Sequence, residues 1–129
     1  MNAIATRADD SLLRHLEPLA RGARIVRDSQ DRLLLEIPVD GRRILVQVLR
    51  RADHLEATAL LGWPLPEMRE AAERRKPSLQ VIESEGSAFV RARVEGARDI
   101  EQLARDAAQI IRTADFTPVI CDVFAHFQD

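Results

Sequence analysis

The side chains best suited to acid–base, nucleophilic or metal chemistry are few in this chain and far apart in the sequence. The three histidines are His15, His54 and His126, and the single cysteine is Cys121. A zinc site gathers several ligands, commonly at short spacing, and only Cys121, Asp122 and His126 approach that spacing. A lone cysteine near a histidine is far more often a small buried residue beside a surface residue than a ligand or nucleophile. We therefore predict no metal, no cofactor and no catalytic residue.

Charge and aromatic content argue against nucleic acid and anionic membranes as partners. The 19 basic and 21 acidic residues give a net charge of -2, with four Phe, one Trp and no Tyr. Such a chain has neither the global positive field nor the stacking surfaces that those ligands use. The pairs Arg42-Arg43 and Arg50-Arg51 have acidic neighbours in Asp40 and Asp53, which favours solvated strand ends over phosphate contacts.

Length and composition predict one globular domain spanning residues 1–129. The apolar fraction is 46% and the charged fraction 31%, a balance typical of a folded domain. Residues 1–10 are polar and are expected to be flexible, with no apolar segment like that of a secretory signal. No apolar run approaches the length of a membrane span, and one cysteine allows no internal disulfide. The expected location is the cytoplasm.

The N-terminal half predicts a short helix followed by strands. Leucines at helical spacing indicate a helix within residues 11–20, which Pro18 must shorten or kink. Alternating apolar and polar residues then predict four strands of an antiparallel meander, at 24–28, 33–39, 44–49 and 55–61. Asp40-Gly41 indicates a tight hairpin turn between the second and third of them.

The C-terminal half predicts a helix, a second hairpin and a long helix. Pro66 is expected to begin a helix through Arg75, and a hairpin over 79–94 turns at Glu85-Gly86. Asp99 and Gln102 form a capping-box-like pair before an apolar helical face. Thr117-Pro118 is expected to begin a short final segment in a C-terminal extension, 117–129. The fold class is α+β, a mainly antiparallel sheet with helices on one face, in the order α-β-β-β-β-α-β-β-α plus a tail.

One predicted strand is apolar on both of its faces. In the stretch 44–49, three apolar residues point one way, while Leu45 and Leu49 point the other. Leu34 is expected on that same outward face, and Trp63 beside it. A sheet covered by helices on one face is usually polar on the other, so either a partner protein or the chain's own tail must cover these residues.

The central stretch LEATALLGWPLP, residues 55–66, together with chain length and element order, resembles the class I type III secretion chaperones of bacteria and the related YbjN-like domains. The resemblance covers about residues 11–115. It implies a small homodimer without enzymatic activity that holds an extended segment of a secreted client on apolar surface. Leu34, Leu45, Leu49 and Trp63 are then the expected protein-binding residues.

The predicted function is accordingly that of a non-enzymatic, cytoplasmic protein-binding module. One alternative is a YbjN-like regulatory domain with no role in export. Another is a small ligand-binding protein or enzyme whose pocket lies between sheet and helices, using His54 or the Cys121 and His126 end of the chain.

Overall fold

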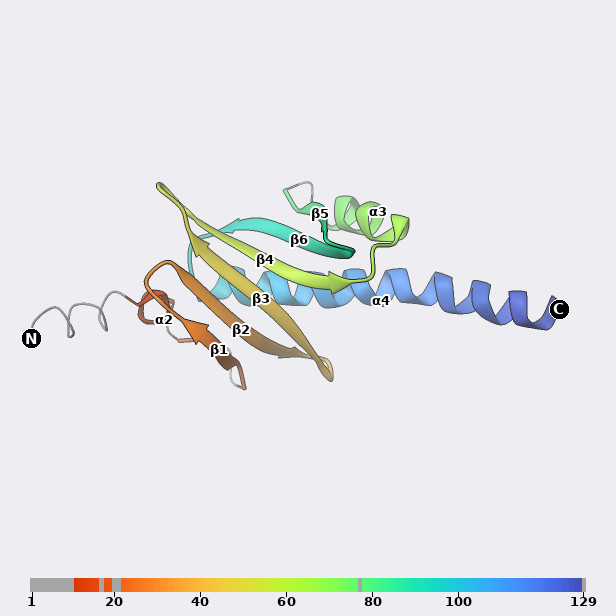
Figure 1. Cartoon of the computed structure of the whole chain (residues 1–129), viewed down its shortest axis with the longest axis horizontal. Coiled ribbons are helices and arrows are strands. Elements are labelled where there is room, and N and C mark those ends of the chain that lie inside the picture. Colours follow the sequence, from red (N-terminus) through yellow and green to blue (C-terminus); the bar gives the residue numbers. More distant parts are fainter. Residues whose placement is uncertain (1–10, 17, 20–21, 77, 129) are drawn as a thin grey trace, which may run out of the picture.

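In the described residues, six strands form one open antiparallel sheet, and three helices lie on one of its faces (Figure 1). The computed structural model describes residues 11–16, 18–19, 22–76 and 78–128, with side chains up to Ala114 except that of His15. The strands are β1 (Arg24–Asp28), β2 (Arg32–Val39), β3 (Arg42–Arg50), β4 (Leu55–Gly62), β5 (Gln80–Ser84) and β6 (Ser87–Val94). The helices are α2 (Leu12–His15), α3 (Pro66–Arg75) and α4 (Ala97–Gln128). The predicted fold class and element order are confirmed; the flexibility predicted for residues 1–10 lies outside the described residues.

The sheet order is β1-β2-β3-β4-β6-β5. The first four strands follow the chain, each pairing with the next. The chain then leaves the sheet through α3 and returns at β5, but it is β6 that pairs with β4. As a result, β1 and β5 are the two edge strands.

Two tight turns of two residues each set the register of the β2–β3 and β5–β6 hairpins. Asp40 and Gly41 have φ values of 49° and 81°, and Glu85 and Gly86 have 52° and 79°. Two consecutive residues with positive φ make a type I′ turn, whose twist matches that of the strands it joins. Both turns lie where the sequence predicted them.

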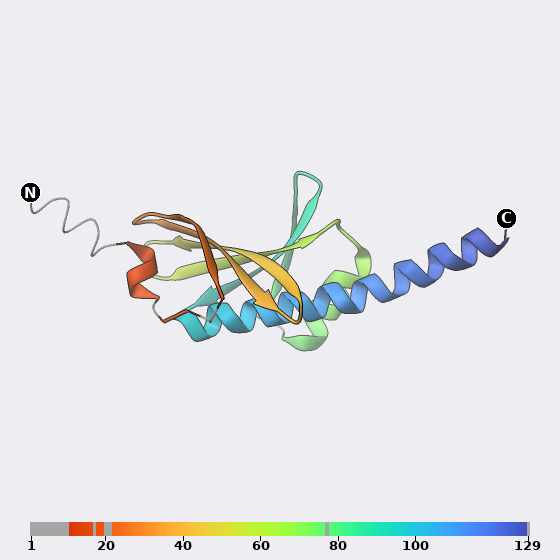
Figure 2. The same ribbon diagram turned by 90° about the horizontal axis from the view of Figure 1, so that it is seen from below.

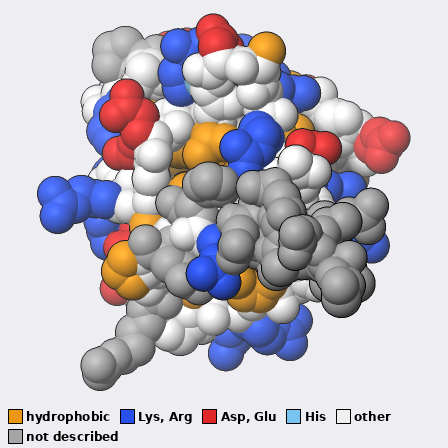
Figure 3. All heavy atoms as spheres, turned by 90° about the vertical axis from the view of Figure 1, so that its left-hand side faces the viewer, with side chains coloured by type: hydrophobic (Ala, Val, Ile, Leu, Met, Phe, Trp, Pro, Cys, Tyr) orange, Lys and Arg blue, Asp and Glu red, His pale blue; other side chains and the backbone are white. Residues whose placement is uncertain are grey.

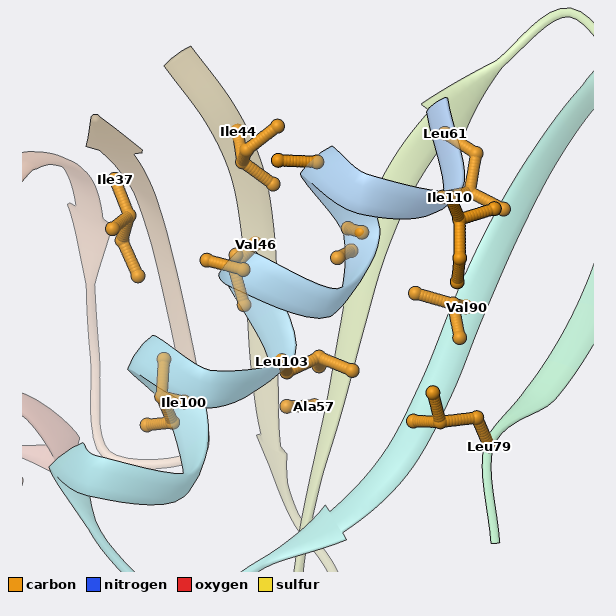
Figure 4. Close-up of a cluster of buried hydrophobic side chains, with 14 of the residues drawn as sticks. Ile37, Ile44, Val46, Ala57, Leu61, Leu79, Val90, Ile100, Leu103 and Ile110 are labelled. Carbon is orange, nitrogen blue, oxygen red and sulfur yellow. The ribbon is translucent and has the colours of Figure 1, made fainter. Parts of the chain in front are cut away.

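The core fills the space between the sheet and the helices. Alternate residues of β2, β3 and β4 are buried on the helix side, for example Leu35, Val46 and Ala59, each 0% exposed. Figure 4 shows Ile100 and Ile110 of α4 pointing toward these strands. The apolar face predicted for this helix is therefore the one that packs.

The two short helices also contribute to the core. Leu12 and Leu16 are buried at and just after α2, and the amide of Leu12 donates to the carbonyl of Ser29 at 3.0 Å. This helix ends before Pro18, as expected of a short helix. In α3, Pro66 is the first helical residue and the buried residues are Met68, Ala71 and Ala72, as predicted.

Two predictions about α4 are wrong. Its first residue is Ala97, so Asp99 lies in the first turn and accepts a 2.8 Å hydrogen bond from the Glu95 amide. Gln102 instead donates to Asp106, and the capping-box pair does not form.

Thr117-Pro118 begins no separate segment either, because α4 is one helix through Gln128 and extends past the sheet (Figures 1 and 2). Extending a helix that is already packed costs far less than nucleating another, and this favours continuation through the proline. The side chains of Cys121, Asp122 and His126, and of Phe124 and Phe127, lie outside the described ones.

Candidate protein-binding surface

The face of the sheet opposite the helices, here called the outer face, is organised in rows that cross the strands. Residues that are partners across antiparallel strands point to the same side of the sheet. The register pairs Arg24 with Glu36, Glu36 with Leu45, Leu60 with Phe89, and Phe89 with Ile82. The β3–β4 register, which pairs Val46 with Ala59, puts Leu45 across from Leu60 when extended by one residue.

One of these rows is apolar over four adjacent strands. It consists of Leu45, Leu60, Phe89 and Ile82, from β3, β4, β6 and β5, and we call it the apolar row. All four side chains are half-buried, and in β3, β4 and β6 the adjacent residues that point to the helix side are fully buried. The outer face thus carries a continuous apolar band that no helix covers among the described residues.

Three of the four residues predicted from sequence lie on the outer face. Leu34, Leu45 and Leu49 point outward and are half-buried. Trp63 follows the last residue of β4 and is 76% exposed, the most exposed large hydrophobic side chain described. Leu45 belongs to the apolar row, Leu34 lies diagonal to Leu45 on β2, and Leu49 lies in a more polar row opposite Glu56.

Sequence reasoning missed Leu60, Phe89 and Ile82. Their signal was present, because Leu60 alternates with the inward Ala59 and Leu61, and Phe89 lies between the inward Ala88 and Val90. What the sequence could not supply was the pairing of β4 with β6, which joins these side chains into one row.

Arginine predominates among the charged residues of the outer face. Its outward strand positions carry six arginines and two glutamates, namely Arg24, Arg27, Arg32, Arg43, Arg91, Arg93, Glu36 and Glu56. The whole chain is slightly acidic, with net charge -2. The sheet therefore separates charge, giving a basic face on a weakly acidic molecule.

The two glutamates are already paired within the chain. Glu36 pairs with Arg24, and Glu56 pairs with Arg51 at 3.1 Å and more distantly with Arg91 at 4.0 Å. Among the described residues, no ion pair is formed by Arg27, Arg32 or Arg43. These guanidinium groups remain available for carboxylates of a partner, which an arginine can bind through two parallel hydrogen bonds.

A polar cluster surrounds His54 beyond the end of β3. The Nδ1 of His54 lies 2.6 Å from Oδ1 of Asp53, and Arg93 lies 3.3 Å from the same nitrogen. The hydrogen bond from His54, and then its charge, lower the pKa of Asp53 below its ordinary value. An open groove of about 370 Å³ is lined by His54 and Ser78 among others, but no hydrogen bond joins these two side chains in the described part of the chain. The geometry gives the imidazole an orienting carboxylate without an aligned nucleophile.

A second polar cluster is centred on Asp106 of α4, the one buried charged side chain among the described residues. Arg75 donates to Asp106 Oδ1 from Nε and Nη2 at 3.1 and 2.9 Å, and Gln102 donates to the same oxygen at 3.1 Å. Lys76 lies 3.5 Å from Oδ2. The adjoining pocket, of about 240 Å³, lies between β6 and α4, yet its buried carboxylate already has its partners. These contacts fasten the end of α3 to α4.

Metal and membrane features were also sought among the described residues. There, no group of three His, Cys, Asp or Glu side chains is placed to hold a metal ion, and no helix is long and apolar enough to cross a membrane. The end of the molecule viewed in Figure 3 carries basic and acidic side chains side by side, with small hydrophobic areas between them.

Comparisons with protein-family models, with curated proteins and with solved structures give no match to this chain.

Proposed function

We propose that the chain is a protein-binding module that holds an apolar or strand-forming segment of another protein on the outer face of its sheet. The observation that carries this proposal is the apolar row, half-buried across four strands, together with the exposed Trp63 directly after β4 in the chain. Binding would remove this apolar surface from water, which is the main source of affinity in such contacts. The resemblance of residues 55–66 to secretion chaperones supports a secreted client and a cytoplasmic setting.

The charge of the outer face favours a segment that also carries carboxylates. Arg27, Arg32 and Arg43 have no ion pair among the described residues, and bidentate pairing with Asp or Glu would orient a segment lying along the apolar row. Charge of this kind contributes more to specificity and association rate than to affinity.

The test begins with a partner identified by affinity capture and then purified. Its dissociation constant is measured against the wild-type chain, Leu60→Lys and Trp63→Ala, with Glu70→Ala on the opposite side as the matched control. We expect Leu60→Lys to weaken binding at least about ten-fold, since it places a charge in the centre of the contact, and Glu70→Ala to change nothing. Equal affinities for all four chains would contradict the proposal, as would tight binding of a single-stranded oligonucleotide in place of protein.

The identity and the conformation of the captured partner distinguish two more specific roles. If the chain is a chaperone, its client is an exported protein and the bound segment of that client lies extended. Amide hydrogen exchange of the bound segment should then lack the protection pattern of a helix. A YbjN-like regulatory domain predicts a folded partner that stays in the cell.

A further inference from the structure

A basic pocket lies where β3 leads into β4. It has a volume of about 500 Å³ and is open to solvent. Its charged and titratable lining residues are Arg50, Arg51, Asp53, His54, Arg93 and Glu95. Three arginines outnumber two carboxylates there, so the pocket is positive before the histidine is counted. The fold creates this excess, because it brings Arg93 of β6 to the end of β3, a strand distant along the chain.

Hydrogen bonds to the backbone hold Arg50 in place without neutralising it. Its amide donates to the Asp31 carbonyl at 2.8 Å, and its Nε donates to the Gln30 carbonyl at 3.0 Å. No carboxylate among the described residues forms an ion pair with Arg50, so its two Nη groups keep their capacity to donate. The neighbouring Arg51, by contrast, pairs with Glu56 at 3.1 Å.

The contact between His54 and Asp53 leaves Arg93 without an acceptor. Nδ1 of His54 lies 2.6 Å from Oδ1 of Asp53, and an ionised carboxylate only accepts hydrogen bonds, so this nitrogen carries a proton. A protonated Nδ1 cannot also accept from Arg93, whose Nη2 lies 3.3 Å away. Arg93 faces Glu56 across the β4–β6 ladder, but that carboxylate pairs with other arginines. The Arg93 guanidinium is therefore free to bind an anion, as far as the described residues are concerned.

We propose that this pocket binds the dianionic phosphate group of a phosphate monoester. Nη groups of Arg50 and Arg93 donate to the phosphate oxygens, and His54 donates from Nε2 when its ring carries both protons. A phosphate offers three acceptor oxygens in different directions, which suits donors on β3, on β6 and on the connection between β3 and β4. A carboxylate offers two oxygens in one plane. Apart from the imidazole, the lining contains no aromatic ring, so a nucleobase finds no stacking surface there.

The histidine makes this binding depend on pH. With Nδ1 donating to Asp53, Nε2 of a neutral His54 is an acceptor, and only the imidazolium form donates from both nitrogens. The other charged groups that face His54 are Arg50, Arg51, Asp53, Glu56, Arg91, Arg93 and Glu95. Side chains of these types ordinarily keep their charge between about pH 5 and 8, whereas histidine loses its own. The affinity for an anion of fixed charge should therefore fall as the pH rises across this range.

The test is titration calorimetry of the full chain at constant ionic strength. Sulfate serves as the dianion of fixed charge, and it should bind more tightly at about pH 6 than at about pH 8. Ribose 5-phosphate and a phosphoserine peptide are the monoester probes. Their relative affinities distinguish a free small molecule from a modified protein side chain, and either one should bind more tightly than dimethyl phosphate, a singly charged diester.

Arg93→Gln should weaken the binding of sulfate and of the monoesters about five-fold, the effect of one exposed ion pair. The matched control is Arg112→Gln, which makes the same change at the opposite end of the sheet, where Arg112 pairs with Asp40 of the β2–β3 turn. It should leave the affinities unchanged.

Two further variants probe the other sides of the pocket. His54→Gln replaces the imidazole with a donor that does not titrate, so sulfate binding should lose its dependence on pH. Glu95→Gln removes a lining carboxylate that has no ion pair among the described residues, and should tighten binding about two-fold. These side chains are exposed or half-buried, so each variant should remain folded, which circular dichroism checks.

Four results would overturn the site: no saturable binding of sulfate or of either monoester, equal affinities for monoester and diester, equal losses in Arg93→Gln and Arg112→Gln, or wild-type sulfate binding that does not weaken as the pH rises. The site goes beyond the proposed function and does not depend on it. The two fail separately, because Leu60, which tests the proposed function, does not line this pocket.

Discussion

The two edge strands of the sheet, β1 and β5, are both five residues long, but they present different obstacles to a further strand. The β1 ladder shifts register between Ile25 and Arg27, and two outward arginines, Arg24 and Arg27, lie along it. In β5 the ladder is regular, and its single charged side chain, Glu83, is exposed.

The difference matters for any strand that is added at an edge. In β1 the outward side chains next to such a strand include two arginines, Arg24 and Arg27, whereas in β5 they are the uncharged Gln80, Ile82 and Ser84. The comparison teaches that edge protection is local: a bulge with two arginines closes one end of the sheet, and the other end is left open.

The largest expected effect concerns the helix that supports β1. Leu12→Ala removes a side chain that is 0% exposed and packs in the core, and should lower the free energy of unfolding by about 3 kcal/mol. Urea denaturation measures the loss, and hydrogen exchange should show β1 and β2 opening before β5. Equal hydrogen-exchange rates in β1 and β5 would contradict the idea that α2 stabilises the β1 edge.

The next effect concerns the support of β5. Asp106→Ala removes the buried carboxylate that holds Arg75 and Lys76, and should cost about 2 kcal/mol, less than a fully buried pair because both cations are partly exposed. Asp106→Asn keeps an acceptor for Arg75 and is the matched variant, with a smaller loss. Since α3 leads directly into β5, we also expect faster hydrogen exchange in β5 in Asp106→Ala; unaltered stability would show that the cluster does not hold α3.

A smaller increase in stability is expected from a substitution in the turn that follows β5. Glu85 has φ of 52°, a conformation that asparagine adopts more easily than glutamate. Glu85→Asn should therefore raise the free energy of unfolding by about 0.5 kcal/mol. Thermal unfolding is the measurement, and a lower midpoint would contradict a type I′ turn at this position.

The smallest expected effect concerns Asp53, which lies outside both edge strands and therefore serves as a control for them. The pKa of Asp53 is lowered from its ordinary value of 3.8, first by the hydrogen bond from His54. A carboxyl group with a lower pKa in the folded state stabilises the fold above its ordinary pKa and loses that contribution as pH falls through the folded value. We expect an NMR titration midpoint for Asp53 below 3.8, and Asp53→Asn to remove this part of the acid sensitivity. A midpoint above 3.8 would place His54 elsewhere.

Local elements were predictable from the sequence to within a few residues. The turn at Asp40-Gly41, the start of α3 at Pro66 and the buried face of α4 all follow from side-chain type and spacing, because positive φ, a missing amide and a 3.6-residue period are local properties. The end of α4 was not predictable, since a proline that commonly starts a helix can also lie within one that packing has already formed.

The candidate surface was predictable in part. The outward positions of Leu34, Leu45 and Leu49 were predictable, because apolar residues at alternate positions give a period-2 signal within single strands. Asp106 gave no signal, since only the approach of Arg75 and Lys76 from another helix explains a buried carboxylate there.

The sequence by itself determined which residues of each strand face the helices, where the hairpins turn, and that arginine supplies nearly all positive charge. Only the tertiary structure decided that β6 lies between β4 and β5. That choice aligns Leu60 with Phe89 and makes β5 an edge. It depends on how α3 and α4 pack over the sheet, and such packing joins residues distant in sequence, which no local period can specify.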